Sequence, residues 1–269
     1  MSLPEPSTEA GRAGLDALLG KPREALIALD FDGVLAPIVP NPMESRMAEG
    51  GIATLRRLAS LVGRLAIITG RQAQVVVEIG ELSSVPGIVV EGQYGAEQWR
   101  DGVLTLPDPP PGLAAVRAEL AGLLADADPG VWVEDKASSL VVHTRRAADP
   151  VGELARLAPR LVPVAERHGL EANDGRNVVE IRPPGIDKGG ALRRLVAEFQ
   201  PSAVLFAGDD VGDLPAYDAV VALRGEGIPG LTVGSVSDEA PQIAERADLA
   251  VPGPAGVVAF LAGLADAIG

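Results

Sequence analysis

Two aspartates, Asp30 and Asp32, follow the apolar run 26–29 and precede Gly33. A short apolar run bounded by a glycine predicts a strand buried on both faces, and open α/β sheets keep their chemistry at the carboxyl ends of such strands. Side chains two positions apart lie on the same side of an extended chain, so both carboxylates can share one site while Gly33 lets the backbone turn away. Two like charges this close are costly without a cation. The alternative interpretation is a solvated strand end with an Asx turn.

Further polar residues stand where other predicted strands end or a predicted helix begins. They are Thr69 at the end of strand 64–69, Lys188 at the start of helix 188–199, and Asp209, Asp210 and Asp213 after strand 204–207. Alone, each has an ordinary structural explanation as a strand residue, a solvated helix start or a helix cap. Together with Asp30 and Asp32 they bring five carboxylates to one sheet edge, which predicts a divalent cation and favours Mg²⁺. Lys188 at a helix amino end and the Thr69 hydroxyl favour an anion, so the expected ligand is a phosphate.

The elements that position these residues alternate between strand and helix, which predicts an α/β fold: a doubly wound parallel sheet, Rossmann-like, with right-handed crossovers. The predicted strands are 26–29, 64–69, 88–90, 204–207, 231–233 and 249–251, and the predicted helices are 52–62, 75–79, 188–199 and 255–267, with a short helix after Asp213.

A different pattern lies between two breakers, the proline-rich stretch 106–112 and the Pro-Pro-Gly stretch that ends at residue 185. It predicts helix 113–123, strands 131–134 and 140–144, helix 154–164 and strand 178–181. Strands that are close neighbours in the sequence indicate an antiparallel sheet with helices on one face. We therefore predict a core domain of residues 1–108 and 185–269 and an inserted α+β cap domain of residues 109–184, with hinges that suit a lid.

Polar residues alternate along the three predicted cap strands. The residues expected on one face are Trp132, Glu134 and Lys136, then Val141, His143 and Arg145, then Val178, Glu180 and Arg182. This face could present hydrogen-bonding groups to a ligand, or it could be an ordinary solvated face of an antiparallel sheet.

The composition excludes several classes of function. The 269 residues carry a net charge of −14, which opposes binding to nucleic acid or to an anionic membrane surface. The chain has no cysteine, which excludes thiolate catalysis and Cys-ligated metal, and its two histidines make the usual zinc sites hard to build, so any metal must be held by oxygen ligands. The first 23 residues lack the apolar core of a signal peptide, and no later run reaches membrane-spanning length, so we expect a cytoplasmic protein. The sequence leaves the oligomeric state undetermined, and a monomer is plausible.

Four short motifs of the chain resemble the signatures of the haloacid-dehalogenase-like phosphatases and occur in the same order. They are the Asp-x-Asp-Gly sequence that begins at Asp30, Thr69, Lys188 and the Gly-Asp-Asp turn that contains Asp209 and Asp210. The resemblance implies that Asp30 attacks phosphorus and forms an aspartyl phosphate, and that Asp32 is the general acid and base. It implies that the phosphoryl oxygens are held by Thr69, Gly70 and Lys188. It also implies that Mg²⁺ is bound by the side chains of Asp30 and Asp209 and by the backbone carbonyl group of Asp32, with support from Asp213 or Asp210.

The cap residues resemble one branch of that superfamily, the trehalose-6-phosphate phosphatases. The similar motifs are Glu134-x-Lys136, His143-x-Arg145, Glu180-Ile181-Arg182-Pro183 and the loop Gly92-Gln93-Tyr94-Gly95-Ala96-Glu97. The resemblance implies a phosphatase of trehalose 6-phosphate in which Glu134, Lys136, Glu180 and Arg182 bind sugar hydroxyl groups.

Two departures and several rivals accompany this resemblance. Gly212 and Leu214 stand where the acidic turn of the family commonly has Thr and Glu, and Val34 stands where the superfamily often has Thr. The metal affinity is therefore open. The rivals are phosphatases of sucrose phosphate or mannosylglycerate phosphate, the phosphomannomutases, and a non-catalytic sugar-phosphate sensor or regulatory partner.

Overall fold

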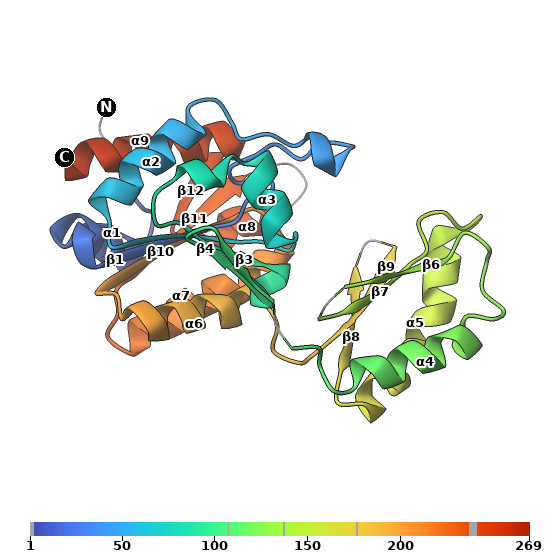
Figure 1. Ribbon diagram of the computed structural model, residues 1–269. Helices are drawn as coiled ribbons and strands as arrows, with labels where there is room; N and C mark the ends of the chain where they lie inside the picture. The colour runs from blue at the N-terminus through green and yellow to red at the C-terminus, as the bar shows by residue number, and fades with distance from the viewer. Residues whose placement is uncertain (1–2, 107, 137, 176, 237–240) are drawn as a thin grey trace. The chain divides into compact units, whose positions relative to one another are not determined.

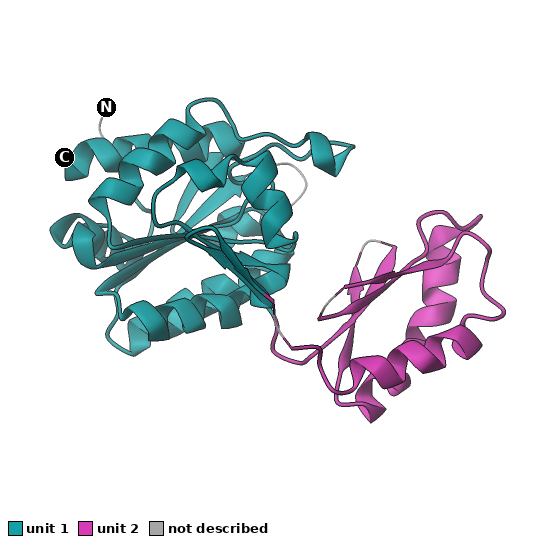
Figure 2. Cartoon of the chain, viewed as in Figure 1, with its two compact units in different colours: residues 1–105, 187–269 teal, residues 106–186 magenta. Residues whose placement is uncertain are grey.

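The computed structural model of the chain describes residues 3–106, 108–136, 138–175, 177–236 and 241–269. The chain divides into two compact units, residues 1–105 with 187–269 and residues 106–186 (Figure 2). The sequence had placed the boundaries at 108/109 and 184/185. Residue 107 of the predicted linker lies outside the described residues. No helix in the described part is long and apolar enough to cross a membrane.

The first unit is built on an eight-stranded sheet in the order β12-β11-β10-β1-β2-β3-β4-β5. Its parallel strands are β1 (Ala25–Leu29), β2 (Arg64–Ile68), β3 (Val89–Gly92), β10 (Ala203–Gly208), β11 (Gly230–Val236) and β12 (Leu249–Pro252). All residues of β1 and β10 are buried, as expected of parallel strands covered on both faces. The prediction of a doubly wound α/β sheet is confirmed.

Two strands at one edge of this sheet were not predicted. β4 (Glu97–Arg100) and β5 (Val103–Thr105) pair antiparallel, so the sheet is mixed at this edge. They are joined by Asp101 and Gly102, which both have positive φ angles, as in a two-residue hairpin turn. Both strands are short, and β5 is exposed, so the apolar pattern that marks a buried strand is missing. The Asp-Gly pair was the available signal.

Helices cover both faces of the core sheet (Figure 1). One buried cluster joins the sheet to α1 (Glu9–Gly20), α2 (Gly51–Leu61), α3 (Ala73–Ile79) and α9 (Gly253–Ile268). The other joins it to α6 (Lys188–Phe199), α7 (Leu214–Gly225) and α8 (Pro241–Arg246). α7 has 12 residues and is longer than the short helix predicted there.

Helix α1 was missed by the sequence analysis. The side chain of its N-cap residue, Thr8, accepts a hydrogen bond from the N–H of Gly11, and the helix buries Leu15 and Leu18. A capping threonine before a leucine-rich stretch was the available signal.

The second unit is a four-stranded antiparallel sheet in the order β6-β7-β9-β8, covered by α4 (Leu113–Leu123) and α5 (Pro150–Arg167). Its strands are β6 (Trp132–Asp135), β7 (Leu140–His143), β8 (Glu171–Gly175) and β9 (Val178–Arg182). Leu140, Val142, Val179 and Ile181 face the helices. The polar strand β8 was not predicted, because its sequence lacks apolar alternation.

Candidate active site

The carboxyl ends of β1, β2 and β10 bring the predicted chemical groups together. Leu29 of β1 pairs with Ala207 of β10 and with Ile67 of β2, so the residues that follow these strands leave the sheet at one edge. The Asp30 N–H donates to the Ala207 carbonyl oxygen at 2.9 Å, which continues the pairing by one residue. Asp30 and Asp209 are therefore neighbours because their strands are neighbours.

A buried ion-pair network links Lys188 to two aspartates. Lys188 Nζ lies 2.8 Å from Asp30 Oδ2 and 2.6 Å from Asp213 Oδ1, and all three side chains are almost completely buried. The other oxygen of Asp30, Oδ1, accepts the Phe31 N–H at 2.7 Å. A buried ammonium group is stable only when it is paired, and Lys188 has a carboxylate partner on each side.

Asp213 holds the acidic turn through its second oxygen. Asp213 Oδ2 accepts the N–H groups of Asp209 at 2.8 Å and of Asp210 at 3.1 Å, while Asp210 Oδ1 accepts the Gly212 N–H at 2.9 Å. These bonds form a capping box around residues 211–213. Asp210 therefore shapes the turn, and this capping arrangement is made without the Thr and Glu that Gly212 and Leu214 replace.

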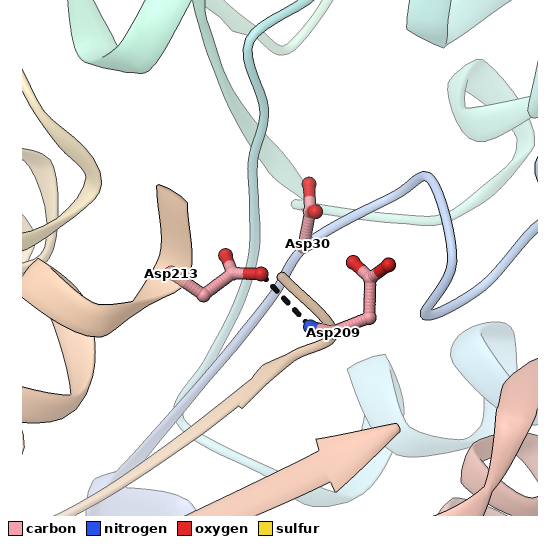
Figure 3. Close-up of side chains that lie close together, drawn as sticks. All are labelled: Asp30, Asp209 and Asp213. Carbon is pink, nitrogen blue, oxygen red and sulfur yellow. Dashed lines mark hydrogen bonds between the residues drawn. The ribbon is translucent and has the colours of Figure 1, made fainter. Parts of the chain in front are cut away.

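Asp30, Asp209 and Asp213 form a buried acidic triad (Figure 3). One carboxylate oxygen of each lies within 4.8 Å of the others, which is close enough for one ion to touch all three. In the described part of the chain, this triad does not include the carboxylates of Asp32 and Asp210. The triad could hold a metal ion, and its all-oxygen ligand set suits a hard divalent cation.

The electrostatics of the triad also favour a cation. Burial, and then the charges of Asp30, Asp213 and Asp210, raise the pKa of Asp209 from 3.8 to about 9. Burial raises the pKa of Asp30 to about 7, although Lys188 opposes the shift. Burial disfavours the charged form of Lys188 too, but the surrounding carboxylates hold its pKa well above the ordinary value. The site thus has more negative charge than Lys188 can neutralise, and a bound cation would favour the ionised carboxylates.

Gly33 leaves room for Asp209. Its φ angle is +69°, and a Cβ atom at this position would lie 1.9 Å from Asp209 Oδ2. Any side chain here would clash with the acidic triad, so the glycine is required sterically as well as by its conformation. The buried Ser235 hydroxyl at the end of β11 donates to the Gly33 carbonyl oxygen at 2.5 Å. Sequence reasoning missed Ser235, and no motif marked it.

Asp32 is held by Arg71, a residue to which sequence reasoning assigned no role. Arg71 Nε donates to Asp32 Oδ2 at 2.5 Å, and Arg71 Nη2 donates to Asp32 Oδ1 at 2.6 Å. Arg71 Nη1 also donates to the Pro42 carbonyl oxygen at 2.6 Å. This bidentate pair fixes the plane of the Asp32 carboxylate and connects the loops after β1 and β2. Its position directly after Thr69-Gly70 was the available signal.

Thr69 and Gly70 form the turn between β2 and α3. The Thr69 side chain is buried, and its hydroxyl oxygen accepts the Arg71 N–H at 3.2 Å. The Thr69 N–H donates to the Glu91 carbonyl oxygen, and the Thr69 carbonyl oxygen accepts the Tyr94 N–H, both at 2.9 Å. The turn is thus fixed to β3 and to the loop that follows it.

The four predicted sugar-binding residues lie on the face of the cap sheet opposite its helices. The strand register places Glu134 opposite Val141, Val141 opposite Glu180, and Glu180 opposite Asn173 of β8. Glu180 lies 3.5 Å from Lys136 Nζ and 3.8 Å from Arg182 Nη1, and Glu134 Oε2 lies 3.0 Å from His143 Nε2.

Three of these side chains, Lys136, Glu180 and Arg182, are less exposed than an ordinary solvated face requires. The exposed fraction of the side chain is 17% for Lys136 and 15% for Glu180 and Arg182, whereas Glu134 is 44% exposed. Trp132 stacks on His143 with ring centroids 4.3 Å apart, and Arg146 lies over the Trp132 ring. Around Lys136, Glu180 and Arg182 the face is therefore a packed polar surface, and it becomes more solvated at Glu134 on β6.

The family is decided by a comparison of the sequence with known families. The sequence model described as "Trehalose-phosphatase" matches residues 28–252, which include the acidic triad and the whole cap. The chain belongs to the trehalose-phosphatase family. A trehalose-phosphate phosphatase of Mycobacterium avium (strain 104) is 35% identical over 98% of this chain and 67% of its own length. The chain thus spans about two thirds of that relative, and membership of the family makes it a phosphatase.

Solved structures show the fold of the trehalose-phosphatase family in this chain. The C-terminal domain of a C. albicans trehalose-6-phosphate phosphatase superimposes with a TM-score of 0.71 at 21% identity, covering 99% of each chain. A trehalose-6-phosphate phosphatase of Aspergillus fumigatus gives a TM-score of 0.70 at 23% identity, covering 98% of this chain and 99% of the other. At these identities the likeness concerns the fold alone.

Proposed function

We propose that this chain is a cytoplasmic, Mg²⁺-dependent enzyme that hydrolyses trehalose 6-phosphate to trehalose and inorganic phosphate through an aspartyl phosphate. The observation that carries the proposal is the buried network of Lys188, Asp30 and Asp213 beside Asp209 at the carboxyl edge of the sheet. It provides a carboxylate nucleophile, a cation for the phosphoryl oxygens and a triad able to hold a metal ion, which are the components that phosphoryl transfer requires.

Mg²⁺ is assigned to the side chains of Asp30 and Asp209 and to the backbone carbonyl group of Asp32. Asp213, and Asp210 in the turn, support these ligands. The three buried carboxylates and their raised pKa values fit a hard cation with oxygen ligands. When bound, Mg²⁺ supplies positive charge that keeps these carboxylates ionised and offsets their repulsion toward the phosphate.

Asp30 is the proposed nucleophile. Its carboxylate attacks phosphorus while the bond between phosphorus and the sugar oxygen breaks, and Asp32 gives its proton to that oxygen. A water molecule then attacks the aspartyl phosphate, Asp32 takes a proton from the water, and phosphate leaves with Asp30 restored. Lys188, the Thr69 hydroxyl and the backbone at Gly70 are assigned to the phosphoryl oxygens, where they stabilise the charge of the transition state.

The cap face is assigned to the sugar. Glu134, Lys136, Glu180 and Arg182 offer acceptors and donors for hydroxyl groups, and each hydroxyl left unpaired in the complex would cost about 1 to 3 kcal/mol. This requirement is the physical basis of selectivity among disaccharide phosphates, because a ligand with its hydroxyl groups elsewhere cannot form hydrogen bonds with these charged side chains.

The proposal is tested by measuring phosphate release from a panel of sugar phosphates with added Mg²⁺. We expect the highest kcat/KM with trehalose 6-phosphate, and no turnover after chelation until Mg²⁺ is restored. Equal or better turnover of sucrose phosphate or of mannosylglycerate phosphate would reject the substrate assignment. Binding of a sugar phosphate without release of phosphate would identify a regulatory protein instead.

A further inference from the structure

Glu97 lies at the start of β4 and is 5% exposed. Glu97 Oε1 accepts the N–H of Ala73, the first residue of α3, at 2.5 Å. A carboxylate at a helix amino end is favoured both by the free N–H group and by the helix dipole. Gln72, the residue at the N-cap position of α3, makes no capping bond with its own side chain within the described residues. A side chain from a neighbouring strand therefore takes the place of the local cap.

The contact between Glu97 and Ala73 fixes one end of the turn at Thr69 and Gly70. This turn is held at its other end by β2, and α3 begins at Ala73, three residues after Gly70. If the first N–H of α3 lost its partner, the helix start could shift and carry the turn with it. Because the turn contributes the proposed phosphate ligands, a shift of about 1 Å can cost on the order of a hundredfold in rate.

The backbone around Glu97 is shaped to keep this contact. Glu97 pairs with Gly92 of β3, and a Cβ atom at Gly92 would lie 2.4 Å from the Ala73 nitrogen and 2.7 Å from Glu97 Oε1. Only glycine leaves room for the hydrogen bond at this point.

The loop between Gly92 and Glu97 makes further bonds to the same turn. Gln93 and Tyr94 have φ angles of +48° and +60°, a conformation that is unfavourable for residues with side chains. In this conformation the Gln93 N–H donates to the Arg71 carbonyl oxygen at 2.8 Å, and the Tyr94 N–H donates to the Thr69 carbonyl oxygen. Strained backbone of this kind concentrates at functional sites.

From these contacts we propose that Glu97 is a positioning residue: it sets the place of the Thr69-Gly70-Arg71 turn, and through Arg71 the place of Asp32. The inference rests on the proposed function, because it assigns the turn to the phosphoryl group. It differs from a purely structural role in one consequence. A structural role changes only the unfolding temperature, whereas a positioning role changes phosphate binding and turnover in protein that is fully folded.

Three substitutions separate reach from charge. Glu97→Gln keeps an acceptor oxygen at the same reach, Glu97→Asp keeps the charge but is one methylene too short, and Glu97→Ala removes the acceptor. We expect Glu97→Ala and Glu97→Asp to lower kcat/KM about 10- to 100-fold and to weaken inhibition by inorganic phosphate about tenfold, while Glu97→Gln stays within about threefold of the wild type. Measurements are made well below the unfolding temperature of each variant.

The matched control is Gln74→Ala on the exposed face of the same helix. Gln74 donates to Glu78 at 3.0 Å and has no contact with the turn among the hydrogen bonds of the described residues. We expect its kcat/KM and its inhibition by phosphate to stay at wild-type values.

Two results would overturn the proposal: Glu97→Asp and Glu97→Ala within twofold of the wild type in both quantities, or an equal loss in Gln74→Ala. If Glu97→Ala does not fold, the comparison of Glu97→Asp with Glu97→Gln decides. A wild-type protein that releases no phosphate would instead reject the proposed function, and calorimetric titration of the same variants with inorganic phosphate would then test the positioning of the turn separately.

Discussion

Two aspartates beside strands of the core sheet, Asp209 and Asp248, are both almost completely buried but lie in opposite surroundings. Asp209 follows β10 at the carboxyl edge and is 6% exposed, while Asp248 precedes β12 and is 3% exposed. The charges that act most on Asp209 are those of other carboxylates, Asp30, Asp213 and Asp210, and its pKa is raised to about 9 by burial and by them.

Asp248 is fully supplied with donors. Its carboxylate accepts hydrogen bonds from the Thr8 hydroxyl, from the N–H and hydroxyl of Thr232 at 2.8 Å each, and from the Arg224 guanidinium. Burial opposes ionisation, but these bonds outweigh it and lower the pKa of Asp248. The comparison teaches that burial of an acid does not by itself mark a functional site. A functional site is marked instead by an acid that is buried among other carboxylates, an arrangement that stabilises the fold only when a cation is bound.

The largest expected effect distinguishes the two sites by activity. Asp30→Asn removes the proposed nucleophile, and we expect kcat to fall on the order of 10⁴-fold or more, with no phosphate bound covalently to the protein. Rapid-quench labelling with radioactive substrate measures both. The unfolding temperature should stay near that of the wild type, and Asp248→Asn should keep its kcat at low temperature. Equal losses of kcat in the two variants would remove the distinction.

Asp209→Asn tests whether Asp209, at the carboxyl edge of the sheet, binds the cation. We expect the Mg²⁺ concentration needed for half-maximal activity to rise at least about tenfold, since an anionic ligand is lost. In chelator the same variant should unfold at a temperature equal to or above that of the wild type, because a neutral amide replaces a carboxyl group whose ionisation the folded state disfavours. Calorimetric scans with and without Mg²⁺ provide the measurement. If the variant is less stable than the wild type in chelator, as expected when a fully hydrogen-bonded aspartate such as Asp248 is replaced, the assignment is contradicted.

Asp248→Asn tests the structural aspartate. The neutral amide loses the charge-assisted bonds to Arg224 and Thr8, and we expect the free energy of unfolding to fall by about 1.5 to 3 kcal/mol. Denaturant titration measures this change. Thr8→Ala, which removes one donor and the N-cap of α1, should cost about 1 kcal/mol and serves as a smaller step in the same series.

The pH dependence of stability should have opposite signs at the two sites. In chelator, Asp209 binds its proton more tightly in the folded state, since its pKa rises from 3.8 to about 9, so its contribution to stability is lost as the pH rises between these values. Asp248 has a lowered pKa, so its contribution is present above 3.8 and is lost as the pH falls through the folded value. Unfolding temperatures from pH 3 to 9 for the wild type and both Asn variants measure these slopes. A wild-type slope above neutral pH that Asp209→Asn leaves unchanged would contradict this explanation.

Much of the fold could be predicted because the parallel strands are fully buried and therefore stand out as short apolar runs. Among the helices and strands that were missed, α1, β4, β5 and β8 lie at sheet edges or at the chain terminus, where polar residues and glycine mask the periodicity, and α8 is a six-residue helix between β11 and β12. At these positions pairing and packing with distant segments decide the structure. For example, the Asp248 carboxylate accepts hydrogen bonds from the hydroxyl groups of Thr8, which precedes α1, and of Thr232 in β11.

The chain by itself determined which chemical groups would meet, since residues that follow parallel strands must leave the sheet at one edge. The sequence could not determine which hydrogen-bond and ion-pair partners each of these groups would have. Tertiary structure alone decided that Asp213 bonds to Lys188 while Asp210 caps its own turn, and that Arg71, Ser235 and Glu97 hold the loops. The physical reason is that hydrogen bonds are directional and act over about 3 Å, so distances within the folded chain choose among donors that the sequence leaves equivalent.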